Sequence, residues 1–186
     1  MAARTGCILN TAEIGRDCDI TQATSKDWLR ILETLGIVFF LHPHSNNTLK
    51  RTIKASKLYF YDTGLVSYLT KWSSPGTLES GAMNGAILEN YVVSEIIKSY
   101  HNAGKEPFIY YYRDKDTKEI DVILERDGQL SPIEIKKTAS PSKQLVRVFS
   151  VLDKGIMKRV NGGVLCMYDD LLPLDKDNFI VPIWLI

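Results

Sequence analysis

Two apolar runs between Lys118 and Lys137 contain charged side chains, and these side chains could take part in catalysis or metal binding. The stretch reads "KEIDVILERDGQLSPIEIKK", with Asp121, Glu134 and Lys136 inside the runs. Asp-Gly at residues 127–128 is a strong signal for a type I′ turn, which needs positive φ at both central residues. The resulting antiparallel hairpin places Asp121 directly opposite Glu134, as a non-hydrogen-bonded pair whose Cα atoms lie about 4.5 Å apart.

The alternation of side chains along a strand predicts that these charges share one face of the hairpin. Glu134 and Lys136 are two residues apart, and Asp121 joins them across the strand pair. The other face is expected to carry five aliphatic side chains: Ile120, Val122, Leu124, Ile133 and Ile135. One face would therefore belong to a core, and the other would hold two carboxylates and an ammonium group.

Two opposed carboxylates on a sheet destabilise it. At about 5 Å they repel by roughly 3 kcal/mol at an effective dielectric constant near 20. A shared proton, the nearby lysine or a divalent cation would relieve the repulsion. Hard oxygen ligands of this kind suit Mg²⁺ or Mn²⁺. The alternative is a solvated sheet face with a Lys–Glu pair, but the Glu-Ile-Lys spacing favours the metal site.

The composition is that of a globular protein with one good core or two small ones: 186 residues, 45% hydrophobic and 24% charged. The net charge is only +1, so any contact with nucleic acid must rest on local patches. Three scattered cysteines without a Cys-x-x-Cys motif favour reduced thiols in a cytoplasm. The sequence shows no membrane-spanning run, no signal peptide and no Walker A motif, so neither a membrane nor ATP is an expected partner of this chain.

The N-terminal part predicts two helices followed by a two-stranded wing. Capping-box patterns at Asn10–Glu13 and Thr24–Asp27 start the helices. The second helix carries an apolar stripe, on which Trp28 is expected to pack against another helix, and Gly36 ends it. The strands "IVFFL" and "KLYFYD" then flank a polar loop. This order indicates a winged helix-turn-helix.

The predicted organisation has two domains. The winged helix and a short exit helix occupy residues 1–72, and the segment 73–81, with its Ser-Ser-Pro-Gly run, is expected to be a linker. Residues 82–186 read as a long helix, three strands, a helix and further strands, which indicates a mixed α/β (α+β) domain.

Basic residues cluster in the parts that would face DNA. They are Lys26 and Arg30 in the second helix, Lys50, Arg51 and Lys54 in the wing, and Lys137 and Lys143 after the Glu-Ile-Lys strand. Such clusters suit contacts with phosphates. The alternative is that these are ordinary solvated side chains, since many winged helices bind proteins instead.

The order of elements, with Asp121 and Glu134-Ile-Lys136 in adjacent strands, resembles the PD-(D/E)XK restriction-endonuclease-like fold. The resemblance implies that Asp121 and Glu134 bind a divalent metal ion and that Lys136 positions or activates water. A glutamate of the first helix often completes such a site, which implies Glu89 as a third ligand, with Glu95 as the runner-up. The sequence departs from the family pattern in having Glu-Ile-Asp where Pro-Asp is common.

A closer resemblance covers nearly the whole chain. The segments "KLYFYDTGLVSYL", "LENYVVSEI", "YYYRDKDTKEIDVIL" and "PIEIKK" are similar to the C-terminal region of prokaryotic AAA-type ATPases, a domain of unknown function that follows the ATPase module. That module is absent here, so the chain is expected to be a fragment. The resemblance implies DNA and the upstream ATPase module as partners. Two functions are open: metal-dependent hydrolysis of a DNA phosphodiester, or a catalytically silent module that binds DNA or protein.

Overall fold

The computed structural model describes residues 1–44 and 54–186. The chain is mixed α/β and forms two compact units. The first unit comprises Met1–Leu41 and Ala55–Ser94, and the second comprises His42–Lys54 and Glu95–Ile186. The units divide within a long helix, whereas the sequence predicted a linker at residues 73–81. Part of that segment, Pro75–Ser80, is the short helix α4, which begins with a capping box between Ser74 and Thr77.

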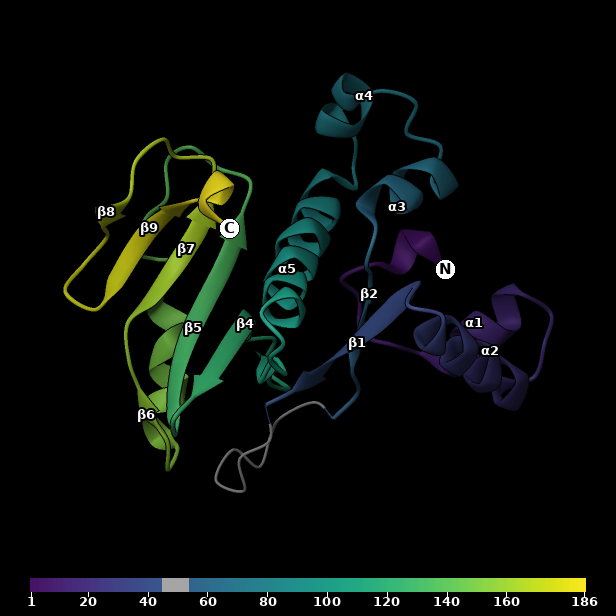
Figure 1. Ribbon diagram of the computed structural model, residues 1–186, viewed down its shortest axis with the longest axis horizontal. Coiled ribbons are helices and arrows are strands. Elements are labelled where there is room, and N and C mark those ends of the chain that lie inside the picture. Colours follow the sequence, from purple (N-terminus) through teal and green to yellow (C-terminus); the bar gives the residue numbers. More distant parts are fainter. Residues whose placement is uncertain (45–53) are drawn as a thin grey trace. The chain divides into compact units, whose positions relative to one another are not determined.

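The first unit consists of short helices and a two-stranded hairpin (Figure 1). Its elements are η1 (Ala2–Arg4), α1 (Thr11–Asp17), α2 (Gln22–Thr34), β1 (Val38–Pro43), β2 (Lys57–Phe60), α3 (Thr63–Leu69), α4 and the first part of α5 (Asn84–Asn102). Strands β1 and β2 pair antiparallel, from Val38 opposite Phe60 to Leu41 opposite Lys57. The expected order of two helices and a hairpin is confirmed.

Side-chain caps fix where the first two α-helices begin. The Asn10 side chain accepts a hydrogen bond from the Glu13 backbone N–H at 3.1 Å, as the sequence predicted for α1. For α2 the prediction was wrong by almost one turn. Thr21 provides the cap, because its side chain accepts from the Thr24 backbone N–H at 3.1 Å. The unit's core is apolar and includes Ala2, Ile14, Leu29, Val38, Leu58, Phe60, Val66 and Ile87.

The second unit is built on a mixed sheet, in which β4, β5, β7 and β9 run side by side (Figure 1). Its strands are β3 (Ile109–Arg113), β4 (Glu119–Arg126), β5 (Gln129–Lys136), β6 (Lys158–Arg159), β7 (Gly162–Cys166), β8 (Leu172–Pro173) and β9 (Asn178–Pro182). The antiparallel strands β3, β4 and β5 are followed by β7 and β9, which continue parallel to β5. The residues at the end of β1, His42 and Pro43, pair parallel with β3.

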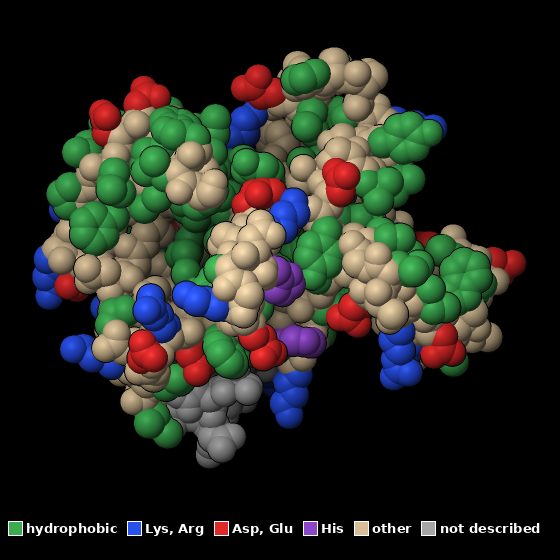
Figure 2. Space-filling view, in the orientation of Figure 1, with side chains coloured by type: hydrophobic (Ala, Val, Ile, Leu, Met, Phe, Trp, Pro, Cys, Tyr) green, Lys and Arg blue, Asp and Glu red, His purple; other side chains and the backbone are tan. Residues whose placement is uncertain are grey.

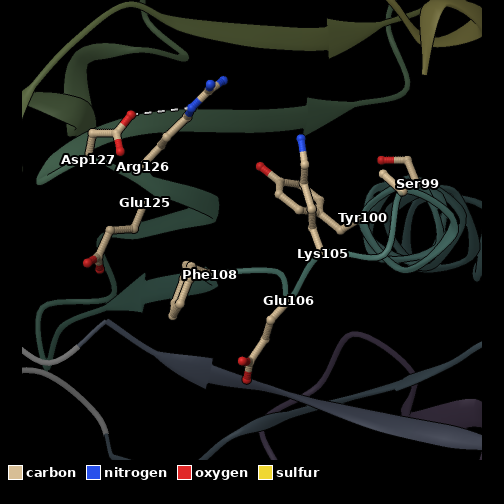
Figure 3. A pocket seen from close by; sticks show the side chains of 9 residues that line it. Ser99, Tyr100, Lys105, Glu106, Phe108, Glu125, Arg126 and Asp127 are labelled. Atoms are coloured by element: carbon tan, nitrogen blue, oxygen red, sulfur yellow. Dashed lines mark ion pairs between the residues drawn. The ribbon is translucent and has the colours of Figure 1, made fainter.

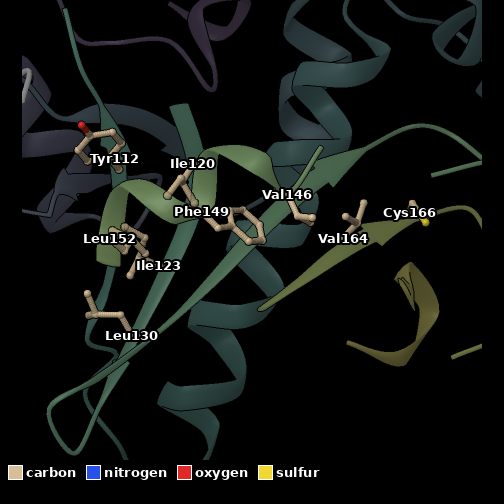
Figure 4. Close-up of a cluster of buried hydrophobic side chains, with 9 residues drawn as sticks. All are labelled: Tyr112, Ile120, Ile123, Leu130, Val146, Phe149, Leu152, Val164 and Cys166. Carbon is tan, nitrogen blue, oxygen red and sulfur yellow. The ribbon is translucent and has the colours of Figure 1, made fainter. Parts of the chain in front are cut away.

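One face of this sheet is covered by the 3₁₀-helix η2 (Arg147–Lys154), at the place where the sequence predicted a helix. Val146, Phe149 and Leu152 pack there against side chains of the strands (Figure 4). The strand residues of this cluster are Tyr112, Ile120, Ile123, Leu130, Val164 and Cys166. A second 3₁₀-helix, η3 (Ile183–Leu185), follows β9. Among the described residues, no helix is both long and apolar enough to cross a membrane.

Candidate functional site

The β4–β5 hairpin has the turn and the register that the sequence predicted. Asp127 and Gly128 have φ values of 52° and 73°, the positive values that a type I′ turn requires. Pairing runs from Arg126 opposite Gln129 to Val122 opposite Ile133. Asp121 and Glu134 lie directly beyond the last of these pairs, Val122 and Ile133.

A β-bulge at Asp121 was not foreseen. On the other side of β4, Tyr110 pairs with Ile123 and Tyr112 pairs with Ile120. Two β4 residues, Asp121 and Val122, therefore lie opposite one β3 residue. Bulges of this kind re-aim side chains and are frequent beside active sites.

The bulge lies where the Asp121 side chain meets the backbone of β5. The Ile135 backbone N–H donates a hydrogen bond to Asp121 Oδ2 at 2.8 Å. The carboxylate of Asp121 thus occupies a position that a strand backbone carbonyl would take in a regular ladder. Both the pairing and this bond hold the carboxylate in place.

The expectation of one apolar face and one charged face was wrong. Ile120 belongs to the cluster under η2 together with Leu130, and Leu130 shares its face of β5 with Glu134 because they are four residues apart. The bulge explains the position of Ile120, since it shifts the alternation along β4. On the opposite face, Leu124 and Ile133 line an apolar pocket. Both faces of the sheet are therefore largely apolar, and the charges lie at the end of one of them.

The predicted grouping of the two carboxylates with the lysine is confirmed. Lys136 Nζ lies 2.9 Å from Glu134 Oε1 and 4.0 Å from Asp121 Oδ2. Asp121 and Glu134 are only 6% and 8% exposed, whereas the Lys136 side chain is 45% exposed. The lysine therefore provides one of the expected remedies for the repulsion between two buried carboxylates.

Glu89, the expected third metal ligand, contacts a lysine and a tyrosine of the first unit. Its Oε1 accepts hydrogen bonds from Lys57 Nζ at 2.9 Å and from the Tyr59 hydroxyl at 2.6 Å. The runner-up, Glu95, pairs with Lys98 at 2.8 Å. Within residues 1–44 and 54–186, no three His, Cys, Asp or Glu side chains are grouped so as to hold a metal ion. Glu89 as a third ligand beside Asp121 and Glu134 stays a prediction.

The residues proposed for DNA contact are exposed wherever the structure describes them. Lys26 and Arg30 lie on α2, where Arg30 Nη1 is 3.9 Å from Asp27 Oδ1, and Lys54, Lys137 and Lys143 are also exposed. Lys50 and Arg51 lie outside the described residues. Contact of these residues with DNA stays a prediction.

The apolar stripe that the sequence predicted on α2 is largely exposed. Trp28, Ile31 and Leu35 are 62%, 56% and 66% exposed, so the expected packing of Trp28 was wrong. The helix buries a different face, through Ser25 and Leu29. Figure 2 shows hydrophobic side chains on the surface of the part that holds α1 and α2. The signal in the sequence was an apolar pattern wider than one buried face.

A pocket in the second unit was not predicted from the sequence, because its walls come from separate segments. It has a volume of about 760 Å³ and lies between the last turn of α5 and the β4–β5 turn (Figure 3). Its lining includes Tyr100, Lys105, Phe108, Glu125 and Arg126.

Comparison with known families classifies the chain. Residues 84–186 match the family described as "Domain of unknown function (DUF4143)". Because this match covers more than half of the sequence, the chain belongs to that family. Residues 1–76 match a second family, "Domain of unknown function (DUF8612)".

Two curated relatives extend the comparison. They are an uncharacterized protein of Mycobacterium bovis and one of Mycobacterium tuberculosis, each 31% identical over 137 residues. The aligned region is 74% of this chain but 30% of each relative, so the chain spans less than a third of the curated relatives it matches. No solved structure matches the chain.

Proposed function

We propose that the second unit is a PD-(D/E)XK-like domain that hydrolyses DNA phosphodiesters with a divalent metal ion, and that the first unit is a winged helix. The observation that carries the proposal is the cluster of Asp121, Glu134 and Lys136. Adjacent strands bring two buried carboxylates within 4.0 Å of one ammonium group. Rigid strands are suited to hold such a constellation in place.

The donor set fits Mg²⁺ or Mn²⁺. Mg²⁺ usually keeps several waters and takes one or two carboxylates together with substrate phosphates, so Asp121 and Glu134 would suffice as protein ligands. A bound ion would polarise the phosphate and lower the pKa of a coordinated water. The two carboxylates would hold the ion.

The residues around that ion have distinct roles in the proposal. The Ile135 backbone N–H orients the Asp121 carboxylate. Lys136, whose side chain is partly exposed, can reach a substrate from the edge of the site and stabilise the negative charge that develops on the phosphate. Its present partners include the same two carboxylates, so a bound metal ion would compete with these contacts.

A second candidate function is a module that binds protein without catalysis. It is favoured by the stripe of Trp28, Ile31 and Leu35, because an exposed apolar patch marks an interaction site. This stripe lies on the helix that would read DNA in a winged helix. Lys26 and Arg30 on the same helix support the DNA role instead.

We further propose that this chain is the C-terminal portion of an AAA-type ATPase, with the ATPase module as its partner. Membership of the DUF4143 family and the greater length of the curated relatives support this context. We also propose a cytoplasmic location. The three free cysteines support it, since exposed Cys7 and Cys18 would persist as thiols in a reducing compartment.

A cleavage assay tests the enzyme proposal. Plasmid and linear DNA are incubated with Mn²⁺ and the wild-type chain, Asp121→Asn or Asp19→Asn. Asp19 is a matched control because it is exposed and its φ of 53° is tolerated by asparagine. The proposal expects cleavage by wild type and Asp19→Asn and none by Asp121→Asn. Equal products from all three, or from none, would contradict it in favour of the binding module.

A further inference from the structure

The pocket between α5 and the β4–β5 turn presents aromatic and cationic side chains side by side. Phe108 is 55% exposed although it is apolar, and Tyr100 faces the same cavity from α5. Lys105 and Arg126 line it from the two walls. Aromatic platforms beside cations are the combination that binds single-stranded nucleic acid, because bases stack and phosphates pair with the charges.

The chain backbone positions the first wall. Gly104, with φ of 66°, ends α5 in a Schellman motif. The Gly104 N–H donates to the His101 carbonyl at 2.9 Å, and the Lys105 N–H donates to the Tyr100 carbonyl at 2.9 Å. The motif therefore places Lys105 beside Tyr100 at the edge of the pocket.

Backbone pairing also positions the second wall. The Glu125 N–H donates to the Phe108 carbonyl at 2.9 Å, which fixes Phe108 beside the end of β4. Arg126 follows directly. Its ion pair with Asp127, at 3.5 Å, joins side chains that are both 86% exposed. Such exposed pairs contribute little, so Arg126 can exchange this partner for a phosphate.

Three acidic residues line the pocket: Glu106 and Glu125 point away from these cations, whereas Asp127 pairs with Arg126. Figure 3 shows the nitrogen atoms of Lys105 and Arg126 above Phe108, the carboxylate of Glu106 below it and the carboxylate of Glu125 beside it. Glu125 Oε2 lies 4.0 Å from His44 Nε2. Burial, and then the charges of Glu125 and Glu106, raise the pKa of Tyr110. The end of the pocket that holds Lys105 and Arg126 therefore holds one carboxylate, that of Asp127, and the other two carboxylates lie away from it.

We infer that this pocket binds one nucleotide unit of a single-stranded nucleic acid, with the base stacked on Phe108 and Tyr100 and the phosphate on Lys105 and Arg126. The inference adds a substrate form to the proposed function but does not require cleavage. The pocket shares no residue with the cluster of Asp121, Glu134 and Lys136. The two sites can therefore be tested independently.

Fluorescence anisotropy with a labelled oligothymidylate in EDTA tests the inference. The variants are Phe108→Leu, which keeps an apolar side chain but removes the ring, and the double variant Lys105→Ala/Arg126→Ala. Phe179→Leu and Lys176→Ala are matched controls, because both residues are exposed and lie outside the pocket.

The wild-type chain and both controls are expected to bind the oligonucleotide equally. Phe108→Leu should weaken binding about 5- to 100-fold, the range for loss of one stacked base. The double variant should also lower the slope of log affinity against log salt by about 0.7 for each phosphate that no longer pairs with a cation. No binding by wild type, or unchanged affinity in both pocket variants, would overturn the inference. Weaker binding by both pocket variants, together with no cleavage by the wild-type chain in Mn²⁺, would support the inference and count only against the nuclease proposal.

Discussion

Asp121 and Ile135 are joined by a hydrogen bond from the Ile135 backbone N–H to the Asp121 carboxylate, at 2.8 Å. A side chain thereby extends the pairing of β4 with β5, next to the bulge between β3 and β4. The same bond orients a carboxylate that we assign to metal binding. Fold and proposed chemistry depend on one hydrogen bond, and substitutions can separate the two roles.

Asparagine and alanine at position 121 should differ in stability. Asn keeps an oxygen acceptor for the Ile135 N–H, whereas Ala leaves this buried N–H without a side-chain acceptor. We expect Asp121→Ala to be less stable than Asp121→Asn by about 1–2 kcal/mol in urea unfolding. At the exposed control position Asp27, whose ion pair with Arg30 spans 3.9 Å, the same two substitutions should differ by less. Equal stabilities at position 121 would show that the hydrogen bond contributes nothing.

Substitution of Lys136 should abolish DNA cleavage without weakening metal binding. Lys136→Met removes an ammonium group 2.9 Å from Glu134 that competes with a cation for the carboxylates. Mn²⁺ should therefore bind as tightly as in wild type or more tightly, while DNA cleavage is lost. Lys176→Met, at a side chain 88% exposed, should change neither measurement. Full cleavage by Lys136→Met would remove the lysine from the mechanism.

Substitution of Glu89 should lower the stability of the first unit. Its carboxylate contacts Lys57, which is only 2% exposed, and the Tyr59 hydroxyl. Replacing this charge by Glu89→Gln should cost about 1–3 kcal/mol, because a buried ammonium loses a charged partner. Glu95→Gln should cost much less, since its pair with Lys98 is partly exposed. A drop in Mn²⁺ affinity with unchanged stability in Glu89→Gln would instead support its role as a third ligand.

His44 should make stability depend on pH. Burial lowers the pKa of His44 from its usual 6.5, although Glu125 acts in the opposite direction. The unfolded chain then binds the proton more readily, so the free energy of unfolding should fall as pH decreases through 6.5. Urea unfolding at about pH 7.5 and about pH 5 should show a smaller fall in His44→Gln than in wild type. His101→Gln, at an exposed position, should behave like wild type.

The parts of the site that depend on local sequence could be predicted. The Asp127–Gly128 turn sets the hairpin register, and the register brings Asp121 and Glu134 together. The bulge could not be predicted, because it arises where β4 pairs with β3, and the hairpin alone contains no signal for that register. The error over Ile120 follows directly from the bulge.

The helices show the same division between local and tertiary causes. The cap at Asn10 is a local pattern and was predicted. For α2 the expected cap was Thr24, but Thr21, three residues earlier, caps the helix. Which apolar face of α2 is buried depends on the rest of the first unit. The helix buries Leu29 and leaves Trp28 exposed, a choice that periodicity alone does not decide.

Isothermal titration calorimetry with Mn²⁺ tests the central proposal most directly. Asp121 and Glu134 should bind one Mn²⁺ in the wild-type chain and in the control Asp19→Asn. Asp121→Asn removes one of the two charges and should abolish most of the affinity, without unfolding the protein, since asparagine still accepts from Ile135. If wild type shows no binding heat and Asp121→Asn loses stability instead, the cluster is a structural ion-pair network. The proposal that the second unit is a metal-dependent nuclease would then be wrong.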